Sequence, residues 1–269
     1  MNKPKDVPRW GFTLIELIVT IAILGVLLAL LAPSFTRALD MADQTACASN
    51  LRQIGFAMQM YLKDNNGYFF PIRENNPNLW YFGEERGSNW ASTAEGSRLL
   101  DKTRAKLYPY VPDYDSVEIC PAFDYGGSFK AKFRGKWWTY GINKDLSPDR
   151  YVNPSLRVRN DAEIRGRDRS RTVVLADAAQ VNTFQPPASR KNPMVEEWHY
   201  VQRRLYRPAD LPHVHFRHRG RANVLFADWH VSACDPAPGT FDARLPGACI
   251  GHLNEEEVTY EPRNLVPSK

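Results

Sequence analysis

Residues 9–31, RWGFTLIELIVTIAILGVLLALL, decide the architecture of this 269-residue chain. From residue 12 onward the stretch is almost wholly apolar, interrupted mainly by Thr13, Glu16 and Thr20. Twenty helical residues rise about 30 Å, which is the thickness of the hydrocarbon core of a bilayer. The sequence therefore predicts a membrane-spanning helix near the N-terminus.

The carboxylate of Glu16 is the unusual feature of this helix. An aspartate at the centre of a membrane helix costs roughly 2.5–3.5 kcal/mol on insertion scales, so an ionisable group there indicates a function. A buried charge is tolerated when it is paired with another group. We therefore expect Glu16 to have a partner.

The segment before the apolar run is basic, with Lys3, Lys5 and Arg9 against Asp6. Positive charge on this flank predicts that the N-terminus stays in the cytoplasm and that the rest of the chain is exported. A cleaved secretory signal is one alternative, but its apolar core is shorter and its cleavage site follows that core. Here the candidate glycine, Gly11, precedes the apolar run. A plain single-pass anchor is the other alternative.

Residues 11–16, Gly-Phe-Thr-Leu-Ile-Glu, resemble the processing signal of type IV pilins and type II secretion pseudopilins. The resemblance implies cleavage between Gly11 and Phe12 by a prepilin peptidase, followed by N-methylation of Phe12. It also implies that Glu16 neutralises the N-terminal amine of a neighbouring subunit during filament assembly. Pro33 falls where many members of the family carry a helix-kinking proline.

The resemblance and the sequence pattern together predict four segments. These are a leader peptide (1–11), a transmembrane and assembly helix (12–34), an amphipathic continuation of that helix (35–64) and a globular periplasmic or extracellular head (65–269).

The amphipathic continuation carries apolar residues at helical spacing. One face of a helix would present Cys47, Leu51, Ile54, Met58 and Tyr61. The sequence Asn-Asn-Gly at 65–67 favours the end of the helix, because these residues tolerate a left-handed backbone. We expect this stripe to pack against the head.

The head is predicted to be loop-rich around a small antiparallel sheet. Residues 171–177 and 222–228 are the clearest strands, since both are mostly apolar. Residues 180–212 are polar and rich in proline and arginine, and we expect them to form a surface excursion. The fold class is therefore α+β and pilin-like, with a long N-terminal helix packed on the sheet.

The chain contains four cysteines, Cys47, Cys120, Cys234 and Cys249. An even number in an exported domain permits two disulfides, and four cysteines allow three pairings. Cys234 with Cys249 and Cys47 with Cys120 is one arrangement, and four free thiols is the alternative. The absence of a Cys-x-x-Cys pair argues against a zinc ribbon.

Histidines gather between residues 213 and 230, at His213, His215, His218 and His230. Together with Asp177 and Asp228 they have the residue types of a metal site, but spacing alone does not show that they converge. We predict no metal and no cofactor. Calcium bound through oxygen ligands such as Asp177 and Asp228 is the alternative.

The arrangement of His218, nine residues and then Asp228 is similar to the C-terminal signature of pilin-like proteins abundant in planctomycete- and verrucomicrobium-type bacteria. Those proteins also carry Cys-x-x-Asn-Leu, Cys-Pro and Tyr-Gly-x-Asn segments, which begin here at Cys47, Cys120 and Tyr140. Where that group has glycine after the aspartate, this chain has Trp229. We interpret His218 and Asp228 as structural, through a side-chain hydrogen bond that fixes the loop before the last core strand.

Composition narrows the remaining classes of function. The net charge of +5 and the lack of a basic helix argue against a nucleic-acid partner. No Gly-x-Ser-x-Gly, His-Glu-x-x-His or P-loop pattern indicates an enzyme.

The resemblance implies a structural subunit of a type II secretion-like or type IV pilus-like filament. Such a subunit would lie in the inner membrane, and its partners would be prepilin peptidase, other pilin subunits and lipid. The alternative is a membrane-anchored module that binds polysaccharide or an exported substrate through the aromatic rings of Trp80, Trp90, Trp137 and Trp138.

Overall fold

The computed structural model describes residues 13–74, 76–86, 94–164, 168–204 and 211–261. It divides into two compact units, Met1–Ala42 and Asp43–Lys269. A single helix, α1 (Leu14–Asp64), contributes residues to both units. The boundary between the units falls inside the predicted amphipathic segment.

Helix α1 ends at Asp64, as predicted. Asn66 and Gly67 have φ values of 54° and 79°, and the Gly67 amide donates to the Leu62 carbonyl over 2.7 Å. This left-handed exit satisfies a carbonyl that the last helical turn leaves open.

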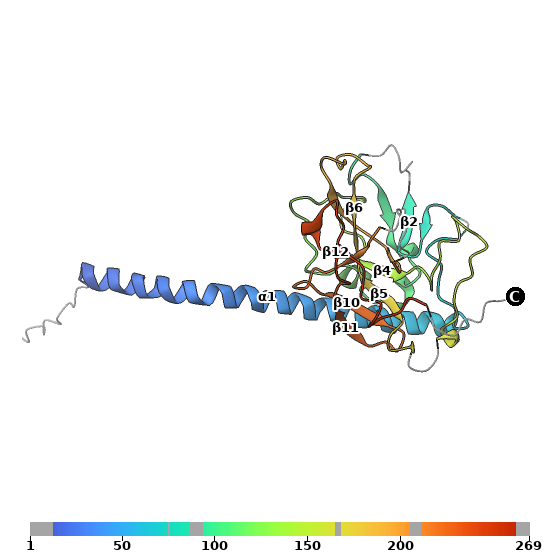
Figure 1. Ribbon diagram of the computed structural model, residues 1–269, viewed down its shortest axis with the longest axis horizontal. Coiled ribbons are helices and arrows are strands. Elements are labelled where there is room, and N and C mark those ends of the chain that lie inside the picture. The colour runs from blue at the N-terminus through green and yellow to red at the C-terminus, as the bar shows by residue number, and fades with distance from the viewer. Residues whose placement is uncertain (1–12, 75, 87–93, 165–167, 205–210, 262–269) are drawn as a thin grey trace, which may run out of the picture. The chain divides into compact units, whose positions relative to one another are not determined.

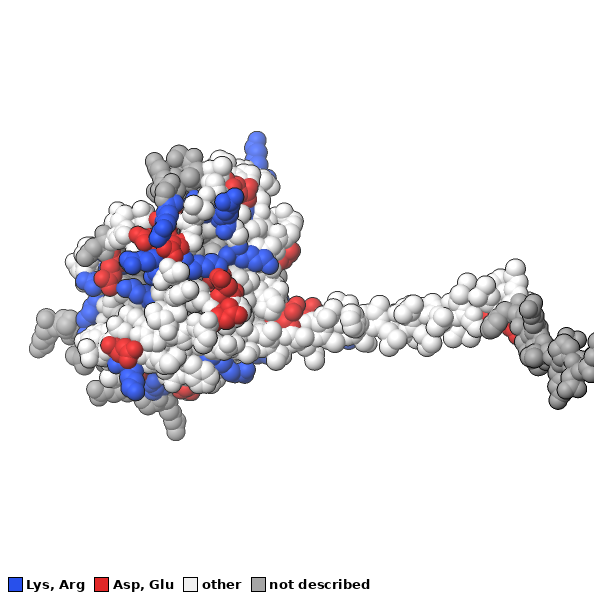
Figure 2. All heavy atoms as spheres, turned by 180° about the vertical axis from the view of Figure 1, so that it is seen from behind, with Lys and Arg blue, Asp and Glu red and all other residues white. Residues whose placement is uncertain are grey.

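From Leu14 onward, the first unit is helical, and its apolar side chains are exposed. Leu14, Leu28 and Leu31 are 75%, 66% and 62% exposed, and charged atoms are scarce along this part of the helix in Figure 2. Its length and composition suffice to cross a membrane. An apolar surface of this extent requires lipid or other protein to cover it.

The second unit begins with the last turns of α1, which present the predicted stripe. Cys47, Leu51, Ile54 and Met58 are at most 1% exposed, which confirms the expected face, and Tyr61 is half-buried against the same core. A Cβ atom on Gly55 would lie 3.1 Å from a methyl group of Leu225, so the glycine lets the helix approach the sheet closely.

The main sheet has five strands in the order β11-β10-β5-β4-β8 (Figure 1). Its strands are β4 (Tyr140–Asn143), β5 (Val173–Asp177), β8 (Tyr200–Val201), β10 (Ala222–Phe226) and β11 (Val231–Cys234). The β4–β8 pair is parallel and the other pairs are antiparallel. The two strands predicted from sequence, β5 and β10, are neighbours at its centre, and this confirms the α+β class.

Three smaller sheets surround this one. They comprise β1 (Leu79–Trp80), β2 (Gly83–Arg86) and β3 (Leu99–Asp101), then β6 (Ala179–Asn182) with β7 (Met194–Glu197), and β9 (Val214–His215) with β12 (Ile250–Gly251). Short helices in the described residues include α2 (Tyr114–Val117) and the 3-10 turns η1 (Lys102–Arg104), η2 (Tyr108–Tyr110), η3 (Asp161–Glu163) and η5 (Pro246–Ala248).

The main sheet is covered on both faces, which explains why β5 and β10 are buried along their whole length. Leu175 and Leu225 pack into the cluster that contains the stripe of α1, whereas Ala176 and Val224 pack into a second cluster with Val214.

The expectation that residues 180–212 form a surface excursion agrees with residues 183–193, most of which are exposed or half-buried, but it is wrong for residues 180–182 and 194–201. This segment supplies β7, β8 and most of β6, and Glu196, Glu197 and His199 are at most 4% exposed. Polar composition misled the prediction, because these polar side chains are buried as partners of one another and of nearby lysines.

Candidate functional site

The start of α1 forms a reciprocal cap between Thr13 and Glu16. Glu16 Oε2 accepts from the Thr13 amide over 2.8 Å and from its hydroxyl over 2.7 Å, while the Glu16 amide donates to Thr13 Oγ1 over 3.3 Å. This is a capping box, a Thr-x-x-Glu pattern that our sequence analysis missed. Gly11 and Phe12, the predicted cleavage and methylation residues, lie outside the described residues.

Pro33 lies inside α1, which continues through it. Proline has no amide proton and so removes one hydrogen bond from the helix interior. Thr36 Oγ1 donates to the Ala32 carbonyl over 3.0 Å in the same turn. The kink at Pro33 stays a prediction.

A buried cluster joins four distant parts of the second unit: Cys47 on α1, Cys120 after α2, Asp177 at the end of β5, and His218 before β10. Their ligand atoms all lie within 4.8 Å of one another, and each residue is at most 2% exposed.

Hydrogen bonds link the members of this Cys-Cys-Asp-His cluster. Cys47 Sγ lies 3.2 Å from Asp177 Oδ1, and His218 Nε2 lies 3.1 Å from Asp177 Oδ2 and 3.4 Å from Cys120 Sγ. The Asn223 amide also donates to Asp177 Oδ2, over 2.7 Å.

His218 and Asp177 form a charged pair. Burial opposes the imidazolium form, but hydrogen bonds of His218 to Asp177 and Cys120 outweigh it and raise the pKa of His218 to about 9. Burial also disfavours the carboxylate of Asp177, yet Arg217 and His218 hold the pKa of Asp177 below its ordinary value. Burial, with Cys120 and Asp177 nearby, raises the pKa of the Cys47 thiol.

The expected bond between His218 and Asp228 does not form. His218 pairs with Asp177, whereas the Asp228 carboxylate accepts from His230 Nδ1 over 2.5 Å at the surface. Strand β10 lies between the two signature residues, and its rise of about 3.3 Å per residue places them at opposite ends. Asp177 and Asp228 likewise lie at opposite ends of the β5–β10 pair.

All four cysteines are free thiols in the structure. Cys47 and Cys120 lie together in the cluster, as the suggested pairing requires. Cys234 is on β11 and Cys249 follows η5, where each thiol contacts a backbone carbonyl of its own segment. Both disulfides stay predictions.

The turn after β10 keeps its left-handed conformation although Trp229 replaces glycine. Trp229 has a φ of 72°, and its amide donates to the Phe226 carbonyl over 2.8 Å. Left-handed backbone at a bulky residue is uncommon and costs free energy. The indole is packed against the core that contains α1, and this contact holds the residue in place.

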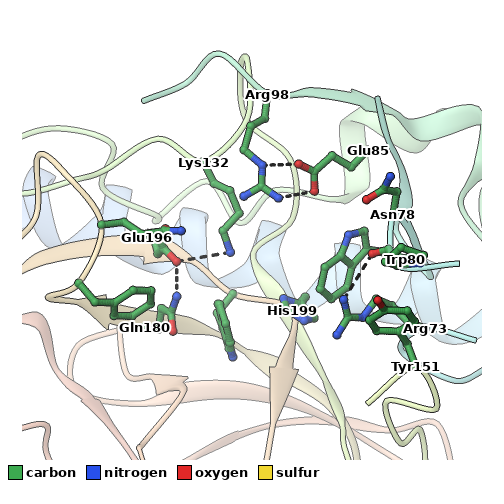
Figure 3. Close-up of a pocket in the computed structure, with 14 residues that line it drawn as sticks. Arg73, Asn78, Trp80, Glu85, Arg98, Lys132, Tyr151, Gln180, Glu196 and His199 are labelled. Atoms are coloured by element: carbon green, nitrogen blue, oxygen red, sulfur yellow. Dashed lines mark hydrogen bonds and ion pairs between the residues drawn. The ribbon is translucent and has the colours of Figure 1, made fainter. Parts of the chain in front are cut away.

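A pocket of about 550 Å³ is lined by residues of β1, β2, β6 and β7 and of the loops next to them (Figure 3). Aromatic rings from Trp80, Tyr151, Phe184 and Trp198 line it, together with the amides of Gln180 and Gln185.

Each cation that lines the pocket faces a carboxylate, as the dashed lines in Figure 3 show for Arg98 and Lys132. Arg98 pairs with Glu85, Lys132 lies 3.4 Å from Glu196, and Arg73 pairs with Asp149 over 2.6 Å. Paired charges of this kind favour an uncharged polar ligand over an ion.

Of the tryptophans predicted to bind a ligand, Trp80 is the one among the described residues that lines this pocket. Trp137 and Trp138 are at most 1% exposed and belong to the core, and Trp90 lies outside the described residues. Trp198 was missed because it lies in the segment expected at the surface.

A long N-terminal helix, bare and apolar in its first part and packed on small antiparallel sheets in its second, defines a pilin-like α+β protein. Comparison with known proteins agrees: residues 11–32 match the family model of the prokaryotic N-terminal methylation motif.

The chain is similar to known secretion and pilus proteins over a stretch of 58 residues. Over 58 residues it is 41% identical to type II secretion system core protein G of Pseudomonas aeruginosa, which covers 22% of this chain and 41% of that protein. The chain is also 41% identical over 58 residues to the type IV wide pilus major component PilA4 of Thermus thermophilus, and the match covers 44% of that protein. The chain thus spans about two fifths of the length of these relatives. No solved structure matches it.

Proposed function

We propose that this chain is a structural pilin-like subunit of a type II secretion-like or type IV pilus-like filament. The observation that carries the proposal is the exposed apolar part of α1, which lies within the matched methylation motif and has one carboxylate there, Glu16. Prepilin peptidase would cut between Gly11 and Phe12, and the Phe12 amine would then be methylated.

Assembly would proceed through this helix. Both described hydrogen bonds to the Glu16 carboxylate end on Oε2. A carboxylate has about four acceptor positions, so Glu16 can cap its own helix and still accept from the Phe12 amine of a neighbouring subunit. The exposed leucines and isoleucines would be covered first by lipid and then by the helices of other subunits.

The proposed orientation in the membrane rests on the charge of the N-terminal flank. Lys3, Lys5 and Arg9 would hold the N-terminus on the cytoplasmic side of the inner membrane. The unit from Asp43 onward would then lie in the periplasm or outside the cell, where it has charges of both signs mixed over the face seen in Figure 2.

Mass spectrometry of the N-terminus tests the processing step. When the chain is produced with a prepilin peptidase, we expect a mature protein that begins at Phe12 with one added methyl group. The variant Gly11→Val should keep its leader, because the peptidase requires the small residue at the cut. A wild-type chain that keeps residues 1–11 in the presence of active peptidase would contradict the proposal.

The pocket supports a second candidate function, the binding of an uncharged sugar by the anchored head. Aromatic rings stack on the apolar faces of sugars, and amides such as those of Gln180 and Gln185 bond their hydroxyls. Phe184 and Tyr151 are 60% and 46% exposed, so both rings are accessible at this site.

Glycan-array screening of the full chain in detergent, followed by calorimetry with the best neutral oligosaccharide, tests this function. Phe184→Ala should weaken binding roughly three- to tenfold, the worth of one aromatic contact. Tyr108→Ala is the matched control, because Tyr108 is 41% exposed and lies outside the pocket. Equal affinities for the two variants would exclude the pocket as the binding site.

A further inference from the structure

The buried cluster of Cys47, Cys120, Asp177 and His218 has a use that filament assembly does not require. We propose that these four side chains bind one zinc ion, which stabilises the second unit. Within the described ranges, no other group of three or more histidine, cysteine, aspartate or glutamate side chains converges in this way.

The geometry of the cluster is close to that of a tetrahedral zinc site. Zinc bonds of about 2.0–2.3 Å place neighbouring ligand atoms roughly 3.3–3.8 Å apart. The measured separations are 3.2 Å for Cys47 to Asp177, 3.1 Å for His218 to Asp177 and 3.4 Å for His218 to Cys120. Small outward movements of the side chains would accommodate the ion.

The chemistry of the donors selects the metal. Two thiolates, one imidazole and one carboxylate favour zinc, whereas calcium and magnesium take oxygen ligands alone. The four residues are at most 2% exposed, which fits a closed structural site and leaves no position for a substrate.

The charges around the cluster balance when zinc is bound. Binding replaces the two thiol protons and the Nε2 proton of the His218 imidazolium, all three of which pass to solvent, so the ligands carry three negative charges. Zinc supplies two positive charges, and the buried guanidinium of Arg217, 3.8 Å from Asp177 Oδ1, supplies the third. Arg217 is held in place by the carbonyls of Thr139 and Ala178, to which Nη2 donates.

Groups around the ligands would also orient them. The Asn223 amide fixes Asp177 Oδ2 over 2.7 Å, and Tyr140 Oη donates to Cys47 Sγ over 3.6 Å. Such outer contacts are typical of metal sites, where they hold ligands in position. A disulfide between Cys47 and Cys120 would not explain why the Asp177 carboxylate and the His218 imidazole lie beside the two sulfur atoms.

The ion would connect the last part of α1 to the segment after α2, to β5 and to the segment before β10. These parts are distant in sequence, so the metal would restrain several long loops at once. Zinc binding of this kind adds directly to the free energy of folding.

Metal analysis of the full chain, purified in detergent without chelator or reductant, tests the proposal. We expect about one zinc per chain by mass spectrometry of the metal. Cys47→Ser and Cys120→Ser should each lower the zinc content about tenfold or more. Cys234→Ser and Cys249→Ser are matched controls and should keep it, because these cysteines lie outside the cluster.

Cobalt substitution of the wild-type chain provides a measurement that does not depend on the folding of any variant. Cobalt in this site should give the visible spectrum of a tetrahedral ion with thiolate ligands. A metal-free protein in which mass spectrometry finds the peptides of Cys47 and Cys120 joined by a disulfide would overturn the proposal. A metal-free protein that shows four free thiols after denaturation and gives no cobalt spectrum when folded would overturn it as well.

Discussion

Replacing Glu16 by alanine is expected to leave the chain in the membrane but to abolish its co-assembly with other subunits. Removing the carboxylate makes insertion easier, because an ionised group in hydrocarbon is costly. In the filament, however, the same change would leave the amine of the neighbouring subunit buried without a counter-charge, which typically costs about 3–5 kcal/mol. Carbonate extraction measures insertion, and recovery of sheared filaments measures assembly.

Glu16→Gln separates the charge from the helix cap. The amide oxygen of glutamine can still accept from Thr13, as Glu16 Oε2 does in the structure, but it has no charge. We therefore expect Glu16→Gln to assemble as poorly as Glu16→Ala. Thr13→Ala, which removes the hydroxyl of the cap and keeps the carboxylate, should assemble. Normal assembly of Glu16→Gln would refute the charge-pairing role.

The variant Glu196→Gln is expected to destabilise the second unit by about 3–5 kcal/mol. Glu196 is 1% exposed and lies 3.1 Å from Lys130 Nζ and 3.4 Å from Lys132 Nζ. Losing the charge would leave two buried ammonium groups without a carboxylate. Urea denaturation followed by tryptophan fluorescence measures the change.

The contribution of Glu196 to the free energy of unfolding should decrease as the pH falls. Burial disfavours its carboxylate, but Lys132 and Lys130 outweigh burial and lower the pKa of Glu196. A carboxylate whose pKa is lower in the folded than in the unfolded state stabilises the fold fully at pH values above its unfolded pKa, about 4.3. This stabilisation is lost as the pH falls through the pKa of the folded state. The difference between wild type and Glu196→Gln should therefore shrink on acidification.

Asp235→Asn is the matched control for this pair. Asp235 and its partner Arg221 lie 3.0 Å apart, but their side chains are 58% and 47% exposed. Exposed ion pairs contribute about 0–1 kcal/mol, so this change should be nearly silent. If Asp235→Asn lowered the free energy of unfolding as much as Glu196→Gln does, the distinction between buried and exposed ion pairs would be contradicted.

Local patterns in the sequence predicted the parts of this fold that depend on neighbouring residues. The stripe from Cys47 to Met58 follows from helical spacing, and the presence of β5 and β10 follows from their apolar runs, although each predicted range was two residues longer than the strand. The end of α1 follows from the Asn-Asn-Gly turn. Each of these features is set by residues within a few positions of one another.

Features that depend on distant residues were missed or assigned wrongly. The cluster draws its members from residue 47 to residue 218, and no spacing rule connects them. The signature pair His218 and Asp228 suggested a local bond, but a strand lies between them and each finds another partner. The sequence indicated a surface position for Glu196, because no local pattern links it to its partners Lys130 and Lys132, which lie more than 60 residues earlier in the chain.

The contact between α1 and β10 has a consequence for biosynthesis. The helix is made and inserted first, whereas Leu225, which packs against Gly55, is made near the end of synthesis. Until β10 is exported, the buried face of the helix has no sheet to cover it. Contacts so distant in sequence form slowly and leave apolar surface exposed meanwhile. A newly exported subunit would therefore depend on chaperones or on the membrane surface until its last strands arrive.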